Sequence, residues 1–100
     1  MDSFQQVLFW LIAGSKGGTN RARILFALEK EPMNSNVLSK KVKLDYKTTQ
    51  HHINLLLENH LIVRTGDKYG QIFFISPQLK DNWSLFKKLF EKKALKEESK

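Results

Sequence analysis

The chain contains no cysteine, and proline is scarce, with 2 residues among 100. Without cysteine, disulfides and thiolate metal sites are excluded. The apolar run at residues 7–13 is too short to span a bilayer, because a spanning helix needs about 20 apolar residues. The opening residues Met-Asp-Ser-Phe lack the basic segment of a secretory signal peptide. We therefore expect a cytoplasmic protein that does not cross a membrane.

Acidic residues are also in the minority. Asp and Glu number 10 against 17 Lys and Arg, which gives a net charge of +7 and a pI near 9.8. Such a basic balance favours nucleic acid or an acidic membrane surface as the partner. The length fits a single domain over residues 1–100, and no repeat or long linker divides it. We expect a body at about residues 19–76 and one additional helix at each end.

Enzyme motifs are missing as well. The sequence shows no nucleophile elbow, no catalytic acid–base pair and no phosphate-binding loop. The glycine-rich stretch at residues 14–20 lacks the spacing and the Gly-Lys-Ser/Thr ending of a P-loop, so it is predicted to be a mobile loop. We therefore do not expect an enzyme.

A helix at about residues 20–30 should follow this loop, with Thr19 or Asn20 as its cap and Pro32 beyond its end. Arg21 and Arg23 lie in its first turn, where a positive charge opposes the helix dipole. We expect these two arginines to bind an anion such as phosphate. The alternative is that both are simply solvated.

A helix-turn-helix is predicted next. Asn34 should cap a short helix at 35–41, and Asp45 should cap a longer one that runs toward residue 60. In this arrangement the second helix enters the major groove of DNA. Helical periodicity divides the second helix into an apolar face and a polar face. The apolar face has Thr49, Ile53, Leu56 and Leu57, and the polar face has Lys47, Gln50, His51 and Asn54.

Two short strands are predicted at residues 61–65 and 69–75, joined by a turn at Gly66-Asp67. A hairpin directly after a recognition helix is a wing. Arg64 and Lys68 flank the turn, so we expect them to lie along a phosphate backbone or a minor groove. A solvated turn is the alternative.

The terminal helices are expected at residues 2–13, capped by Asp2 or Ser3, and at residues 82–96. The first is apolar around nearly its whole circumference, which predicts burial on all sides. We expect a second copy of the chain to cover it, although it could instead pack across its own domain. The lysine-rich side of the last helix could alternatively lie on a membrane surface. The candidate dimer-interface residues are Phe4, Leu8, Trp10, Leu11, Trp83, Phe86, Leu89 and Phe90.

The segments Arg23-Ile-Leu25, Leu38-Ser39, Leu44-Asp-Tyr-Lys-Thr-Thr-Gln-His-His-Ile53 and Leu61-Ile-Val63 resemble the ArsR-type winged helix-turn-helix of prokaryotic transcription regulators. The likeness is closest to small archaeal members and covers about residues 19–76. The resemblance implies a mainly α fold with a small β-hairpin wing. It also implies a dimeric DNA-binding regulator, with residues 46–54 in the major groove.

The sequence departs from that family at three points. Lys43 stands where the family commonly has glycine, so this lysine must adopt a left-handed conformation or the turn must differ. Thr49 replaces the usual valine. The cysteine pairs of the metal-sensing members are absent, and adjacent His51 and His52 point about 100° apart on a helix and cannot chelate one ion together. We therefore expect no metal or other cofactor, and His52 at the edge of the core.

The predicted function is a homodimeric regulator that binds a palindromic site in double-stranded DNA. The alternative is a winged-helix module that binds protein within a transcription complex, which would need an acidic or apolar recognition face. Lysines 40, 41, 43 and 47 flank the polar face and favour DNA. Nothing in the sequence indicates whether a small-molecule effector exists. The candidate DNA contacts are Tyr46, Lys47, Thr48, Gln50, His51, Asn54, Arg64 and Lys68.

Overall fold

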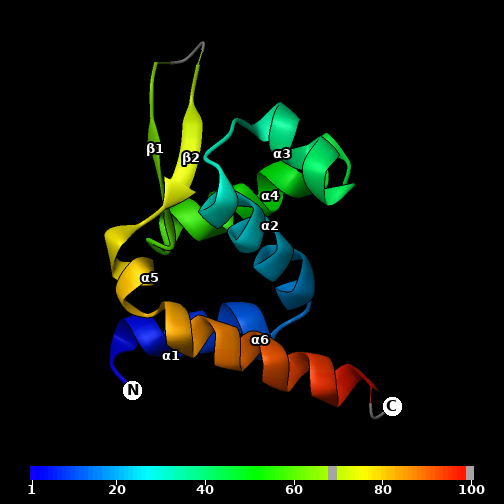
Figure 1. Ribbon diagram of the computed structural model, residues 1–100, viewed down its shortest axis with the longest axis vertical. Helices are drawn as coiled ribbons and strands as arrows, with labels where there is room; N and C mark the ends of the chain where they lie inside the picture. Colours follow the sequence, from blue (N-terminus) through cyan, green and yellow to red (C-terminus); the bar gives the residue numbers. More distant parts are fainter. Residues whose placement is uncertain (68–69, 99–100) are drawn as a thin grey trace.

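The computed structural model describes residues 1–67 and 70–98. The fold is mainly helical and carries one antiparallel hairpin, as predicted. In Figure 1, α2, α3 and α4 lie together in the middle, the hairpin extends from one end, and α1 and α6 lie side by side across the other. The elements are α1 (Ser3–Phe9), the π-helical turn η1 (Trp10–Gly14), α2 (Gly18–Lys30), α3 (Ser35–Val42), α4 (Tyr46–Glu58), β1 (Ile62–Thr65), β2 (Ile72–Ile75), α5 (Pro77–Asp81) and α6 (Trp83–Glu98).

Side-chain caps fix the start of four helices. Asp2, Asn34, Asp45 and Ser76 each accept a hydrogen bond from the backbone N–H three residues further on. Such caps satisfy amide groups that have no partner inside the helix. The first three were predicted from the sequence. The predicted cap of α2 is wrong, because Gly17 takes that position with a φ of 90° and no side-chain hydrogen bond.

The hairpin pairs Ile62 with Ile75 and Arg64 with Phe73. Phe73 and Ile75 are buried while Ile72 is exposed, which is the alternation that a half-buried strand shows. The backbone of Met33 also exchanges two hydrogen bonds with Phe73, so the segment between α2 and α3 is tied to β2. The second strand is shorter than predicted, since it begins at Ile72.

Helix α5 was not predicted. The Ser76-Pro77 pair was expected to close the hairpin, but Ser76 caps a helix whose first residue is Pro77. Proline suits that position because its missing N–H would have no helical partner there. Leu79 of α5 is fully buried, and the short helix turns the chain from the hairpin into α6.

The terminal helices belong to the core of the single chain. Five of the side chains proposed for a dimer interface are at most 9% exposed, namely Phe4, Leu8, Leu11, Phe86 and Leu89. The expectation that a second copy is needed to bury them is therefore wrong. Their burial arises because α6 packs against α1, η1 and α2 together. Trp10 differs, since it is 59% exposed.

An aromatic cluster joins α2 to α6. The ring of Phe26 lies 5.8 Å from Trp83, 4.9 Å from Phe86 and 5.2 Å from Phe90, measured between centroids. Tilted and edge-on pairs of this kind stabilise a fold by about 0.5–1.5 kcal/mol beyond the contribution of their buried area.

Within the described residues, no helix combines the length and apolar character needed to cross a membrane.

Candidate nucleic-acid interface

The turn between α3 and α4 sets the position of the candidate recognition helix. Lys43 ends α3 in the left-handed conformation, with φ 58° and ψ 43°. The N–H of Lys43 donates to the carbonyl of Lys40, and the N–H of Leu44 donates to that of Ser39. The sequence left open whether Lys43 adopts a left-handed conformation or the turn differs, and the structure shows a left-handed lysine. This conformation costs free energy for any residue other than glycine.

The inner face of α4 anchors it to the body. Thr49, Ile53 and Leu56 are completely buried. The hydroxyl of Thr49 donates to the carbonyl of Asp45 at 3.0 Å, so the polar atom that replaces the methyl group of valine has a partner. The substitution therefore leaves no unsatisfied group in the core.

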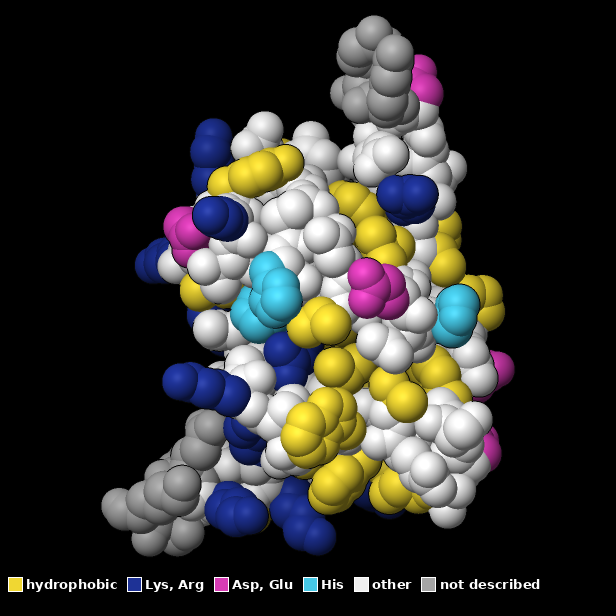
Figure 2. All heavy atoms as spheres, turned by 180° about the vertical axis from the view of Figure 1, so that it is seen from behind, with side chains coloured by type: hydrophobic (Ala, Val, Ile, Leu, Met, Phe, Trp, Pro, Cys, Tyr) yellow, Lys and Arg dark blue, Asp and Glu magenta, His cyan; other side chains and the backbone are white. Residues whose placement is uncertain are grey.

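The outer face of α4 carries the predicted contact residues. Tyr46 is 52% exposed, and Lys47, His51 and Asn54 are also exposed, whereas Thr48 and Gln50 are half-buried. Figure 2 views the molecule from the α4 side and shows Lys, Arg and His side chains spread over this face. The structure thus places Lys47, Gln50, His51 and Asn54 together on the outer side of α4, whereas Tyr46 and Thr48 lie in its first turn about 200° apart.

A chain of hydrogen-bonded side chains runs along this face. The Ser35 hydroxyl donates to Oε1 of Gln50 at 3.0 Å, and Nε2 of Gln50 donates to Oδ1 of Asn54 at 3.0 Å. The amide nitrogen of Asn54 then lies at the outer end of this row of hydrogen-bonded side chains. Amide groups held in this way can donate to and accept from base edges in the major groove. Sequence reasoning missed Ser35, because only the packing of α3 on α4 places it beside Gln50.

The N-terminus of α4 is stabilised by Asp45. Hydrogen bonds with Thr48, through its side chain and then its backbone N–H, lower the pKa of the exposed Asp45 carboxyl. The carboxylate is therefore ionised at neutral pH and caps the first turn. This cap holds Tyr46, Lys47 and Thr48 in helical geometry at the helix end where phosphate groups bind most readily.

Basic side chains surround the α4 face. Lys40 on α3 and Lys43 in the turn are exposed, whereas Lys41, also exposed, lies on the side of α3 that borders α2. Arg64 is exposed on β1, where it borders a hollow shared with Asn54, Leu57 and Glu58 of α4, and not at the tip of the hairpin, whereas Lys68 lies outside the described residues. A polar hollow of about 430 Å³ separates α3 and α4 from the hairpin, and Asn34, Ser35, Tyr46 and Gln50 are among its lining residues. The arrangement combines donors and acceptors for bases with positive charge for phosphates.

The prediction that Arg21 and Arg23 bind phosphate is wrong for Arg21. Its side chain is only 3% exposed and donates to the Leu11 carbonyl at 2.8 Å, the Ser15 hydroxyl at 2.6 Å and the Lys16 carbonyl at 3.0 Å. Burial lowers the pKa of this guanidinium. Arg21 therefore holds the glycine-rich segment to α2, a role that no local sequence signal indicates.

Arg23 is exposed, but its guanidinium also has partners within the chain. It donates to the Val42 carbonyl at the end of α3 and to Oδ1 of Asn20 at 3.2 Å. The carbonyls at a helix C-terminus lack helical partners, so an arginine donor there stabilises the last turn. Arg23 thus stabilises the C-terminus of α3, next to the turn of the helix-turn-helix.

His52 lies at the edge of the core, as predicted, and is 6% exposed. Burial, followed by the charges of Arg21 and His51, lowers the pKa of this imidazole. The rings of His51 and His52 diverge, with centroids 5.7 Å apart. Among the described residues, no three His, Asp or Glu side chains are grouped closely enough to hold a metal ion.

The comparisons with known proteins support the fold. No family model and no curated protein matches the sequence. The reduced form of HlyU from Vibrio cholerae superposes with a TM-score of 0.66 at 18% identity, over 89% of this chain and 92% of that one. A MarR family transcriptional regulator from Silicibacter pomeroyi gives 0.66 at 17% identity, over 93% of this chain and 64% of that one.

A third solved structure is a predicted DNA-binding transcriptional regulator from E. coli, with a TM-score of 0.60 at 19% identity, over 98% of this chain and 93% of that one. At such identities the likeness concerns the fold alone. The helix-turn-helix, the hairpin that follows it and the similarity to these structures together establish that the chain has a winged-helix fold.

Proposed function

We propose that the chain is a sequence-specific transcription regulator that binds double-stranded DNA as a homodimer on a palindromic site. The observation that carries the proposal is the outer face of α4, which is polar, exposed and surrounded by lysines. The similarity in fold to transcriptional regulators supports it. The pattern of residues 44–53 further supports an ArsR-like regulator, although without the cysteines that metal-sensing members use.

The proposed contacts have separate roles. Gln50, His51 and Asn54 reach base edges, where hydrogen-bond patterns distinguish the base pairs. Tyr46, Lys47 and Thr48 contact phosphates or the groove wall. Arg64, and Lys68 beyond the described residues, lie along the backbone or the minor groove that the hairpin reaches.

A protein-binding module is the second candidate function. That function would need an apolar or acidic recognition face on α4. The exposed side chains on this face are instead polar or basic along most of its length, with Glu58 at the C-terminal end. The character of the face therefore favours DNA.

The proposed dimer surface is centred on η1. Trp10 is 59% exposed and the adjacent Phe9 is 41% exposed, and Figure 2 shows hydrophobic side chains gathered on the lower part of the α4 side. Trp83 and Phe90, both half-buried, stay in the proposed interface as supporting residues. A two-fold axis through such a patch is the commonest way to cover it. The same axis would present two α4 helices to major grooves about 34 Å apart.

Selection from a pool of random duplex DNA tests the proposal. We expect wild-type protein to enrich a palindromic sequence with two half-sites about 10 base pairs apart. The variant Gln50→Ala/Asn54→Ala should fold normally but enrich no such sequence. The alternative function would be favoured if wild-type protein enriches no sequence at physiological salt and also fails to bind duplex DNA at low salt, where electrostatic attraction to DNA is strongest.

A further inference from the structure

A second hollow lies between α2 and α3, away from the exposed face of α4. Its volume is about 360 Å³, which falls within the range of about 300–1,000 Å³ that small-molecule sites have. In Figure 1, α4 lies behind α2, whereas Figure 2 shows the α4 face from the opposite side. The lining residues are Arg23, Phe26, Ala27, Lys30, Glu31, Met33, Lys41 and Val42.

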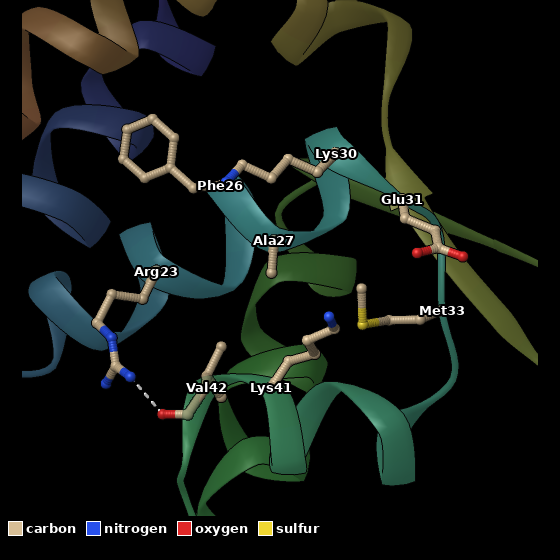
Figure 3. Close-up of a pocket in the computed structure, with 8 residues that line it drawn as sticks. All are labelled: Arg23, Phe26, Ala27, Lys30, Glu31, Met33, Lys41 and Val42. Carbon is tan, nitrogen blue, oxygen red and sulfur yellow. Dashed lines mark hydrogen bonds between the residues drawn. The ribbon is translucent and has the colours of Figure 1, made fainter.

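The inner wall of this hollow is apolar and firmly held. Phe26 belongs to the aromatic cluster with α6, so its ring is fixed in place. Met33 and Val42 are 7% and 3% exposed, and the backbone of Met33 is bonded to β2. Ala27 projects into the middle with only a methyl group, as Figure 3 shows. The small side chain leaves room for a flat apolar group between the two helices.

Three cations surround this apolar wall. Figure 3 shows Lys30 along the α2 side, Lys41 along the α3 side, and Arg23 at the end opposite to Glu31. Across the part of the chain that the structure describes, none of the three cations forms an ion pair with a carboxylate. Two hydrogen bonds, to Val42 and Asn20, hold the Arg23 guanidinium in a fixed orientation and leave its other N–H groups for a ligand.

We propose that this hollow binds a small organic anion, a carboxylate carried on a flat apolar body such as an aromatic ring system. The apolar body would pack on Phe26, Ala27 and Met33, while the carboxylate would accept hydrogen bonds from Arg23 and a lysine. Charged hydrogen bonds beside an apolar wall bind such an amphiphilic anion better than they bind a bare phosphate, which gains nothing from the wall.

A ligand bound in this hollow would affect the turn of the helix-turn-helix. Arg23 holds the carbonyl of Val42, the last residue of α3, immediately before the left-handed Lys43. A carboxylate that shares the guanidinium therefore changes the surroundings of this turn. The binding itself does not depend on the proposed DNA function, because it concerns the free chain.

Nuclear magnetic resonance titration of the full, ¹⁵N-labelled chain without DNA tests the proposal. The probe is naphthalene-2-carboxylate, and its neutral counterpart is naphthalene-2-carboxamide. We expect the carboxylate to shift amide signals between residues 23 and 42 along one saturable curve, and the signals of Lys43 and Leu44 along the same curve. The carboxamide should bind about tenfold more weakly, since it lacks the charge that strengthens each hydrogen bond.

Two variants and one control locate the site. Ala27→Phe fills the hollow and should abolish the shifts. The double variant Lys30→Gln/Lys41→Gln removes two exposed charges without disturbing the core, and it should weaken carboxylate binding about tenfold. The matched control is Lys87→Gln/Lys88→Gln, which removes the same charge from exposed positions on α6 and should bind as wild type does.

Four results would overturn the proposal. The first is the absence of a saturable shift at residues 23–42, and the second is a carboxamide that binds as tightly as the carboxylate. The third is equal weakening by the α6 control, which would indicate general charge attraction. The fourth is a Lys30→Gln/Lys41→Gln variant that loses affinity for duplex DNA but binds the carboxylate unchanged, because those lysines would then be phosphate contacts.

Discussion

Nη1 of Arg21 lies 3.3 Å from Nδ1 of His52, and this contact connects α2 to the middle of α4. Arginine can only donate, so neutral His52 accepts at Nδ1 and carries its proton on Nε2. The same guanidinium also holds the carbonyls of Leu11 and Lys16. One buried residue therefore links η1, the glycine-rich segment and the inner side of the proposed recognition helix.

This contact predicts a pH dependence of stability. The pKa of His52 is lowered in the folded chain, first by burial and then by the charges of Arg21 and His51. The unfolded chain therefore binds a proton more readily than the folded chain does. The stability that His52 contributes is fully present above the unfolded pKa of about 6.5 and is lost as the pH falls through the lower folded pKa.

Urea unfolding of wild type and His52→Gln at a series of pH values measures this effect. Glutamine keeps an acceptor for Arg21 but does not titrate, so the stability of wild type relative to His52→Gln should decline as the pH falls below about 6.5. The matched control is His51→Gln, whose side chain is exposed and is the smallest of the three causes that lower the pKa of His52, so this variant should keep a decline in stability at low pH. Parallel profiles for wild type and His52→Gln would show that His52 is not the titrating group.

A second prediction concerns Gly18, the first residue of α2. A Cβ atom at this position would lie 2.0 Å from the backbone carbonyl oxygen of Ile12, and backbone cannot move aside as a side-chain tip can. We expect Gly18→Ala to destabilise the chain by about 1–3 kcal/mol, the usual cost of forcing extra atoms into a packed site. Thermal unfolding followed by circular dichroism is the measurement.

The control for Gly18 is Gly70→Ala, because a Cβ atom at Gly70 meets nothing within 4 Å. This variant should stay within about 0.5 kcal/mol of wild type, as surface substitutions usually do. If Gly18→Ala is as stable as Gly70→Ala, then η1 and α2 are not as closely packed as the structure places them.

The glycines at positions 17 and 18 have roles that the sequence alone did not predict. Local signals predicted the caps of Asn34 and Asp45, the helix-turn-helix and the hairpin, because each depends on a few neighbouring residues. The stretch at residues 14–20 was predicted to be a mobile loop, yet Gly17 caps α2 in a left-handed conformation and Gly18 allows close approach to η1. That role depends on a helix elsewhere in the chain, which local composition does not reveal.

The same limit applies to the candidate sites. The polar face of α4 follows from helical periodicity, so its residues were identified correctly as one group. The inward turn of Arg21 and the Ser35–Gln50 hydrogen bond depend on tertiary packing. So does the burial of Leu8 and Phe86, because the sequence shows that both helices are apolar but not that they cover one another.

A third prediction separates phosphate contacts from base contacts. Lys47→Ala should weaken binding to all duplex sequences alike and lower the salt slope by about one unit, because one counterion fewer is released. Asn54→Ala should cost about 1–3 kcal/mol on the selected sequence and relax the preference at one base pair. Gel shifts at several salt concentrations measure both effects.

The control for these two variants is Lys88→Ala on α6, outside the proposed interface, which should leave both the affinity and the salt slope near wild type. If Lys47→Ala and Lys88→Ala weaken binding equally, the chain attracts DNA through its net charge of +7 and not through α4.

The last prediction concerns the dimer and follows from exposure. Phe86 is completely buried within one chain, so Phe86→Glu would report on folding and could not isolate association. Trp10 is 59% exposed and its neighbour Phe9 is 41% exposed, so Trp10→Glu removes apolar surface without opening the core. Aromatic anchors near the centre of an interface dominate its energy, and one buried tryptophan from each subunit should contribute several kcal/mol in total, at about 1.5–3 kcal/mol for each large apolar side chain.

Sedimentation at micromolar concentration is the measurement. Wild type should sediment at twice the monomer mass of 11.7 kDa, and Trp10→Glu should sediment as a monomer whose circular dichroism spectrum still matches that of the folded wild type. Its melting temperature should fall, because association of folded chains no longer stabilises it. Val37→Glu is the matched control, because Val37 is 44% exposed on α3, at the other end of the molecule from η1, and should remain dimeric. A wild-type monomer would reject the dimer altogether, and a Trp10→Glu dimer would move the interface away from η1.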